Sequence, residues 1–408
     1  MLKDRDISLL RKLAEKYMSV AALPEQEKTR ALWRSLNGGR MQKPMVLIDQ
    51  MPWEELQDES LLLQIEDPYW RRVERKLRQT LYKWEHLPVD MVLPPYIVLP
   101  RVITNVGYNG LGIQYSEKTL GSGAVRSHEY YDALEDEAAV AALHLPVIEW
   151  DPALEKKHVA EADRIFAGVA PFRIGGVIMH LGIWDWIAKA RGVTNVYMDL
   201  YDRPEHLHAI MRKLTDGVLD AIRQYNALSA FDNAGITCHC SCTLSDDLPS
   251  GGDPVTSDKA WAFGLAQLFS SVSPEITEEF ELPYMKEIFS HFGAIYYGCC
   301  EKLDDRLELI DRLPNVRKVS CSPWSDRESF AEKLNKKYIM SNKPNPALLA
   351  APDFDEALIR DDLRRTMRAA RENGVALEMI LKDISTLKND PTRLWRWARI
   401  AAEETANF

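Results

Sequence analysis

The residues best suited to chemistry in this chain of 408 are its six cysteines, all of which lie in the second half. They are Cys238, Cys240, Cys242, Cys299, Cys300 and Cys321. A thiolate sulfur binds zinc well and is a strong nucleophile. Thiols that only fill a core would be scattered more widely, so this grouping indicates a metal or catalytic site. His239 in "TCHC" and Glu301 in "GCCE" add an imidazole and a carboxylate to it.

Packing is the alternative role for several of these thiols. If "GITCHCSC" is one strand, Cys238, Cys240 and Cys242 point to one face and His239 to the other. They cannot all be ligands, and we expect at least one of them to belong to the core. Cys321 has serine on both sides, and we expect it to be a small packing residue.

Strands and helices must alternate to position these residues. Short apolar segments are separated by amphipathic helices from Asp151 to the end of the chain, which predicts parallel βαβ units. The expected strands are 44–49, 90–100, 175–182, 235–242, 294–299, 316–321, 337–341 and 376–381. The number of repeats favours an α/β fold of the closed (β/α)₈ (TIM) barrel type. We expect one domain over 1–408, with helices in 1–40 and the barrel in 41–408.

Polar side chains gather where these strands end, which is where barrel enzymes place their active sites. The candidates for catalysis are Glu301, Lys382 and Asp383, and the candidates for substrate binding are His180, Trp184, Trp324, Lys343 and Asn345. Each has a structural alternative, such as a buried Lys382–Asp383 pair or tryptophans that pack in the barrel. The glycines of "GYNGLG" at 107–112 lack the context of a nucleotide-binding loop, so we expect a plain loop there.

Composition limits the partners and the location. The net charge is −10, with 46% hydrophobic and 27% charged residues, which argues against binding to nucleic acid or to anionic membranes. No apolar run approaches the roughly 20 residues that span a bilayer. The N-terminal "MLKDRDISLLRKLAEKY" is charged throughout and is not a signal peptide. We therefore expect a cytoplasmic protein, in which disulfides are rare.

The stretch from Gly175 to Asp326 resembles the uroporphyrinogen decarboxylase superfamily, which includes methyltransferases that act on corrinoid-bound methyl groups. The resemblance is carried by "DLYDRPEHLHAIMRKLTDGVLDAI", by "SPEITEEFELPYMKEI" and by the strand that ends in cysteine. It implies a (β/α)₈ barrel with a central cleft.

Two departures from the superfamily's patterns narrow the function that the resemblance implies. The decarboxylases carry an arginine-rich segment after the first strand, whereas "PMVLIDQMPWEELQDE" contains no arginine to pair with a poly-acid. The methyltransferases hold zinc with His-x-Cys and a later Cys. Here Cys300 matches the first cysteine, Gly298 takes the histidine position, and Lys382 and Asp383 lie near the later one. A different ligand set is expected, drawn from Cys300, Glu301, His239 and Cys240; our choice is Cys300, His239 and Cys240.

The function that this resemblance implies is metal-assisted methyl transfer between a small methylated compound and a corrinoid carrier protein. Zinc is the expected metal, and the corrinoid would be carried on a separate protein because the chain has no "DxHxxG" motif. We expect a homodimer and neither nucleic acid nor membrane as partner. The alternatives are decarboxylation of a small non-porphyrin acid by Asp383 and Lys382, and a non-catalytic homologue that binds a corrinoid protein.

Overall fold

The main feature of the fold is a parallel sheet of seven strands in an α/β arrangement. The computed structural model describes residues 2–104, 111–113, 117–120 and 127–408, so most of the predicted loop at 107–112 lies outside the described residues. In sheet order the strands are β1 (Met45–Ile48), β15 (Leu377–Leu381), β14 (Ile339–Asn342), β13 (Val316–Cys321), β12 (Ala294–Tyr297), β11 (Trp261–Gly264) and β8 (His180–Leu181). The first strand of the chain therefore pairs with the last.

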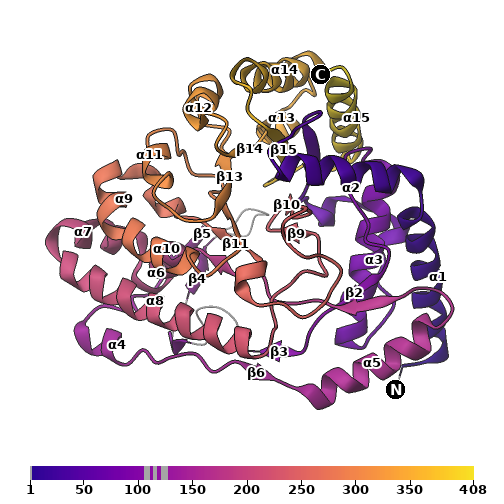
Figure 1. The fold of residues 1–408 in the computed structure, drawn as a ribbon, viewed down its shortest axis with the longest axis horizontal. Helices are drawn as coiled ribbons and strands as arrows, with labels where there is room; N and C mark the ends of the chain where they lie inside the picture. The colour runs from indigo at the N-terminus through magenta and orange to yellow at the C-terminus, as the bar shows by residue number, and fades with distance from the viewer. Residues whose placement is uncertain (1, 105–110, 114–116, 121–126) are drawn as a thin grey trace.

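Helices surround these strands on most sides in Figure 1, with α1 to α3 opposite α6 to α10. The helices before the first cysteine are α1 (Asp4–Ala21), α2 (Pro24–Asn37), α3 (Pro68–His86), α4 (Glu137–Ala141), α5 (Pro152–Phe166), α6 (Ile183–Arg191), α7 (Val193–Asp202) and α8 (Pro204–Ala227). The later ones are α9 (Pro274–Phe280), α10 (Leu282–Phe289), α11 (Leu307–Ile310), α12 (Arg327–Leu334), α13 (Ala347–Ala350), α14 (Glu356–Asn373) and α15 (Thr392–Ala406). Helices α1 and α2 lie within residues 1–40, where the sequence predicts helices. In the described part of the chain, no helix is both long and apolar enough to cross a membrane.

Four small sheets complete the strand inventory of the described residues. One is parallel and joins β2 (Ile97–Leu99) to β7 (Phe172–Ile174). The antiparallel pairs are β3 (Ile103–Thr104) with β6 (Glu149–Trp150), β4 (Glu117–Leu120) with β5 (Ser127–Tyr130), and β9 (Thr237–Cys238) with β10 (Ser241–Cys242). No strand ladder between described residues joins β8 to β1.

Local sequence explains why the main elements form. Helix α3 begins after Asp67, whose carboxylate accepts the N–H groups of Tyr69 and Trp70, and Pro68 occupies its first turn. Strands β12 and β15 are buried along their whole length. Their segments therefore read as continuous apolar runs instead of alternating ones.

The predicted strand over 235–242 is wrong. The chain reverses at His239 and Cys240, so that Cys238 pairs with Ser241 in an antiparallel hairpin. His239 has a φ of +54°, a left-handed conformation that cannot continue a strand. The alternating pattern of cysteines gave no sign of this reversal.

A buried ion pair ties this hairpin to the sheet. Lys318 on β13 and Glu378 on β15 are fully buried, and their charged atoms lie 2.7 Å apart. Lys318 Nζ also donates to Ser241 Oγ (2.6 Å) and to the carbonyl of Cys242 (3.0 Å). The hairpin is therefore fixed over the interior of the sheet, because a buried ammonium needs all of these acceptors.

Candidate functional site

The candidate site lies at the carboxyl ends of β12 and β15. Cys299 and Cys300 follow β12 after Gly298, and Lys382 and Asp383 directly follow β15. Strands β13 and β14 separate these two strands in the sheet. Strands three positions apart in a flat sheet would lie about 14 Å apart. The side chains nevertheless touch, so the sheet must curve to bring the two strand ends together.

The ammonium group of Lys382 lies at the centre of this cluster. Its Nζ is 2.7 Å from Cys299 Sγ, 3.0 Å from Asp383 Oδ2, 3.3 Å from His239 Nε2 and 3.9 Å from Cys300 Sγ. The Lys382 side chain is only 2% exposed, whereas Asp383 is 43% exposed at the open side. Two sulfurs, a carboxylate and an imidazole thus surround one buried cation. We call these five residues the thiol–lysine cluster.

The two sulfurs of the cluster have different environments. Cys300 Sγ lies 3.6 Å from Cys299 Sγ and donates to Asp383 Oδ2 at 2.9 Å. The contact with Cys300 lowers the pKa of the Cys299 thiol, and so do His239 and Lys382, although burial opposes them. The same contact with Cys299, together with burial and Asp383, raises the pKa of Cys300. Cys299 is therefore the thiolate and Cys300 the thiol.

His239 connects the cluster to the hairpin. Its Nε2 lies 3.7 Å from Cys299 Sγ, and its ring stacks on Phe263 with centroids 4.0 Å apart. Burial lowers the pKa of His239, but hydrogen bonds with Cys240 and Cys299 outweigh it and raise that pKa to about 9. His239 thus adds a nitrogen group beside the Cys299 sulfur.

Backbone conformation at the site is unusual at three positions. Gly298, His239 and Asp383 have φ values of +89°, +54° and +56°. Side chains disfavour this region, and residues held in it gather at functional sites. At Gly298 a Cβ atom would also lie 2.6 Å from Leu303 Cδ1 and 3.1 Å from Ser320 Cβ. Only glycine therefore allows the chain to turn into the cysteine pair here.

Glu301 lies beneath the cluster and holds its backbone. Its carboxylate accepts the N–H groups of Cys299 (2.8 Å) and Ala266 (3.3 Å), and the residue is 3% exposed. Burial raises its pKa to about 7 against these backbone hydrogen bonds, and the Cys299 charge adds to the rise. The structure thus places this predicted catalytic residue as a support for the cysteine loop.

Two of the predicted substrate-binding residues at the end of β14 are engaged in local contacts. Lys343 is 2% exposed and donates to Tyr296 Oη and to Ser341 Oγ, the latter at 2.7 Å. Burial lowers its pKa. The Asn345 side chain accepts the N–H of Ala347 at 3.0 Å. Tyr296 Oη is also 3.8 Å from Cys240 Sγ. The hydrogen bonds of Lys343 and Tyr296 therefore support the hairpin from its buried side.

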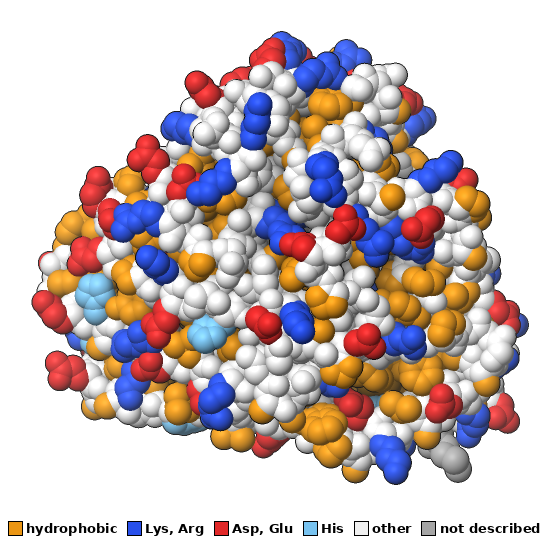
Figure 2. Space-filling view, viewed as in Figure 1, with side chains coloured by type: hydrophobic (Ala, Val, Ile, Leu, Met, Phe, Trp, Pro, Cys, Tyr) orange, Lys and Arg blue, Asp and Glu red, His pale blue; other side chains and the backbone are white. Residues whose placement is uncertain are grey.

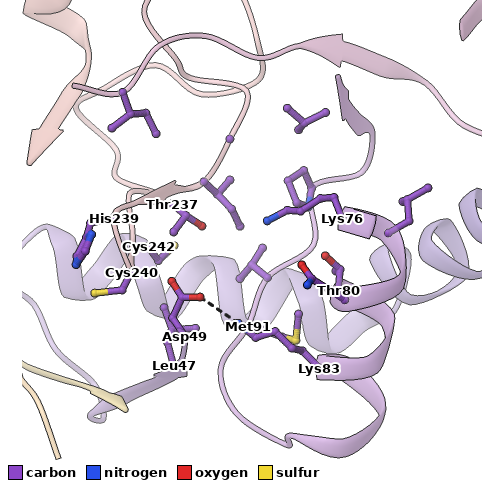
Figure 3. A pocket seen from close by; sticks show the side chains of 18 of the residues that line it. Leu47, Asp49, Lys76, Thr80, Lys83, Met91, Thr237, His239, Cys240 and Cys242 are labelled. Atoms are coloured by element: carbon purple, nitrogen blue, oxygen red, sulfur yellow. Dashed lines mark ion pairs between the residues drawn. The ribbon is translucent and has the colours of Figure 1, made fainter. Parts of the chain in front are cut away.

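A cavity of about 540 Å³ borders the cluster. Figure 3 shows the hairpin residues Thr237, His239 and Cys240 along one part of its wall, and side chains of α3 facing them. His239 lines the cavity and also touches Cys299, so it stands between the cavity and the cluster. The volume falls in the range of small-molecule sites, which is about 300–1,000 Å³.

The remaining predicted substrate-binding residues divide between cavity, core and surface. His180 lines the cavity; partial desolvation and the neighbouring His239 lower its pKa to about 4. Trp184 is fully buried and packs on Phe269 in the core, because it belongs to the inner face of α6. Trp324 is 71% exposed and does not line the cavity. Only His180 of these three is placed to meet a ligand in this cavity.

The donor set for a metal differs from the predicted one. Ligand atoms of Cys299, Cys300 and Asp383 all lie within 4.8 Å of one another. Cys300 is thus grouped with Cys299 and Asp383, and Cys240 instead faces Tyr296. Zinc accepts sulfur and oxygen donors, and three protein ligands leave one position open. The residues present therefore fit zinc, with the Lys382 ammonium beside the thiolates as a counter-charge.

Sequence reasoning passed over several residues that the structure brings to the site. In the prediction from sequence Cys300 is a metal ligand and Cys299 is not, although the two cysteines are adjacent. In the structure Cys299 contacts His239, Cys300 and Lys382. Asp49, Lys76 and Lys83 line the cavity far from the cysteines in sequence. Asp49 could have been predicted to line the cavity, because it lies at the end of the first strand. Lys76 and Lys83 could not, because charged residues are common on helix faces.

Comparison with known proteins shows the fold. No family model matches the chain, and no curated protein matches it in sequence. A solved structure described as a methyltransferase from Methanosarcina mazei is similar, with a TM-score of 0.51 and 14% sequence identity. The match covers 92% of this chain and 98% of that one. The α/β architecture is therefore shared over nearly the whole length of both proteins.

Proposed function

We propose that this protein is a methyltransferase that uses the thiol–lysine cluster to move a methyl group between a small methylated compound and a corrinoid on a separate carrier protein. The observation that carries the proposal is the convergence of two sulfurs, a carboxylate and an imidazole on Lys382, beside a cavity. The structural neighbour described as a methyltransferase supports the reaction class.

Cys299, Cys300 and Asp383 are the residues that would hold zinc in this proposal. When bound, the metal would supply Lewis-acid activation of the heteroatom that carries or receives the methyl group. The protein contributes the charge balance around it. Lys382 offsets the negative sulfurs, and Glu301 fixes the Cys299 backbone so that its sulfur stays aimed at the cluster.

His239 would handle the proton of the reaction. When a methyl group leaves a neutral oxygen or sulfur, that heteroatom becomes an anion and needs a positive or proton-donating neighbour. His239 borders the cavity and lies against the cluster, so its ring is placed to hold that proton. The apolar cavity wall would keep water from competing for the methyl group.

Elemental analysis of protein purified without oxygen tests the metal part of the proposal. We expect about one zinc per chain, lost in Cys299→Ser and in Cys300→Ser. Cys321→Ser is the matched control, because Cys321 is a buried thiol outside the cluster whose nearest polar contact is Asn342 at 3.7 Å. A protein without metal would favour decarboxylation by Lys382 and Asp383, which release of carbon dioxide would reveal.

A second measurement tests the transfer itself. Cob(I)alamin changes its absorbance when it is methylated, so a panel of methylated compounds can be screened against the native protein and Cys299→Ser. Methylation that depends on Cys299 supports the proposal. A spectral change of a corrinoid protein without turnover would indicate the non-catalytic binding homologue.

We also propose that the main sheet closes into a (β/α)₈ barrel. The parallel pair β2–β7 falls in chain order between β1 and β8, the two ends of the sheet. The contact of Cys299 with Lys382 across two intervening strands requires strong curvature. An experimental structure that shows strand pairing between β1 and β8 through β2 and β7 would test it.

A further inference from the structure

The sulfur atoms of the adjacent cysteines Cys299 and Cys300 lie close together. Successive side chains of an extended segment point in opposite directions, which would separate the two sulfurs. Here the chain bends at both residues, and the sulfurs are 3.6 Å apart. A disulfide needs about 2.05 Å between its sulfurs, so these two would have to approach by only about 1.5 Å. Rotation of the side chains with a small backbone shift is therefore enough to bond them.

The surroundings of the two sulfurs suit them to different parts of an oxidation. Cys299 Sγ lies 2.7 Å from the Lys382 ammonium, which stabilises a negative, nucleophilic sulfur. The backbone of Cys299 is held in place, because its carbonyl accepts a hydrogen bond from Ser320 Oγ at 2.6 Å. Cys300 Sγ donates instead to Asp383 Oδ2 at 2.9 Å. Cys299 is thus placed as the nucleophile, and Cys300 is a neighbouring thiol with a carboxylate to accept its proton.

Access from solvent separates this pair from the other thiols. All six cysteines are described and free, and of these only Cys300 is partly exposed. Asp383, its hydrogen-bond partner, is 43% exposed at the open side of the cluster. Figure 2 shows charged side chains of both signs mixed over the visible face, without a wide region of one sign that would attract a charged oxidant. A small uncharged oxidant such as hydrogen peroxide should therefore react at this pair first.

We propose that Cys299 and Cys300 form a reversible disulfide when the metal-free cluster meets hydrogen peroxide. The Cys299 sulfur attacks one peroxide oxygen, the O–O bond breaks, and the departing hydroxide takes a proton from solvent, which leaves Cys299 as a sulfenic acid. The Cys300 sulfur then attacks the Cys299 sulfur and forms the S–S bond. The S–O bond breaks, and the thiol proton passes through Asp383 to the leaving hydroxide. One peroxide is thereby reduced to two waters, and two thiols are oxidised to one disulfide.

This disulfide should be strained and easily reduced. Adjacent Cα atoms lie about 3.8 Å apart, whereas most disulfides join Cα atoms about 4.4–6.8 Å apart. Strained disulfides have the more oxidising potentials that are typical of labile and regulatory bonds. Because the thiolate is the form that binds a metal, the bond would remove both sulfur donors of the Cys299, Cys300 and Asp383 set. The pair would therefore alternate between a reduced form able to bind metal and an oxidised form that is not.

Counting free thiols in chelator-treated protein tests the inference without any methyl transfer. Native protein purified without oxygen has six free cysteines, and one equivalent of hydrogen peroxide should remove two of them, with recovery in dithiothreitol. Mass spectrometry should find two hydrogen atoms missing from the peptide that contains Cys299 and Cys300. Cys300→Ser should stop at a sulfenic acid that dimedone traps on Cys299. Cys321→Ser is the matched control, because it removes a buried thiol outside the cluster and should leave the disulfide unchanged.

Six thiols after peroxide treatment, a disulfide between other cysteines, or a covalent dimer on a non-reducing gel would overturn the inference. So would a loss that dithiothreitol does not reverse, or the native loss of two thiols in Cys300→Ser. Circular dichroism shows whether each variant is folded, and the count on native protein needs no variant. The inference does not depend on the proposed methyl transfer. Zinc-loaded protein that oxidises as fast as chelator-treated protein would contradict the proposed zinc ligands and leave the disulfide standing.

Discussion

The Lys382 ammonium lies 2.7 Å from the sulfur of Cys299, although the two residues are 83 positions apart in sequence. One follows β15 and the other follows β12. The contact pairs a buried cation with a thiolate. Lys382 also contacts His239 and Asp383, so it links these residues to Cys299. The Lys382 ammonium is therefore one of the groups that lower the pKa of the Cys299 thiol.

Replacing Lys382 with methionine should raise the pKa of the Cys299 thiol. The lost ammonium is one of the groups that hold this pKa below the ordinary cysteine value of about 8.5. In chelator-treated protein, thiolate absorbance near the ultraviolet edge should therefore appear only at higher pH than in the native protein. Cys299→Ser defines which part of the signal belongs to Cys299. Lys382→Arg should keep the low pKa, and a Lys382→Met titration identical to the native one would refute this role.

Gly298→Ala should destabilise the protein and displace the cysteine pair. Its backbone conformation disfavours a side chain, and the new Cβ would clash with Leu303 and press on Ser320. We expect a loss of about 1–3 kcal/mol in the free energy of unfolding. Gly39→Ala separates the two effects, because Gly39 has a φ of +74° but open space around a Cβ. Equal losses in the two variants would mean that the contacts at Gly298 do not matter.

Lys318→Met should be among the most damaging single substitutions. It leaves Glu378 buried without its ammonium partner and frees Ser241 in the hairpin. Breaking a buried pair in this way costs about 3–5 kcal/mol. The double variant Lys318→Met/Glu378→Leu removes both charges and should recover much of that stability in urea unfolding. A double variant no more stable than the single one would contradict this account.

Glu281→Gln should flatten part of the pH dependence of stability. Burial raises the pKa of Glu281 to about 8, although Tyr297 donates a hydrogen bond to it at 2.6 Å. Between its ordinary pKa and 8 the group is protonated when folded and ionised when unfolded, so unfolding releases a proton. The free energy of unfolding therefore falls by up to ~1.4 kcal/mol for each pH unit in this window.

The glutamine variant lacks this proton release, so its stability relative to the native protein should increase as pH rises toward 8. Urea unfolding of both proteins at several pH values measures the difference. At pH values below the ordinary glutamate pKa the difference should become constant. A difference that stays constant throughout the window would show that Glu281 is ionised in the folded protein.

Local sequence was enough to predict most of the elements. The apolar runs before Cys299 and Lys382 marked β12 and β15. Parallel strands have their carboxyl ends at the same edge of a sheet. The positions of the cysteines and Lys382 after predicted strands therefore also predicted that they belong to one site. These features depend on periodicity and on caps, which are properties of short segments. The one-domain organisation and the barrel closure stay predictions.

Tertiary structure alone decided which of those residues meet, and how. The left-handed turn at His239 converted an expected strand into a hairpin and aimed its imidazole at Cys299. Packing buried Trp184 and left Trp324 in solvent, although both tryptophans follow strands. Helix α3 placed Lys76 opposite the hairpin. Such relations depend on the curvature of the sheet and on contacts between distant segments, and periodicity along a chain carries no information about either.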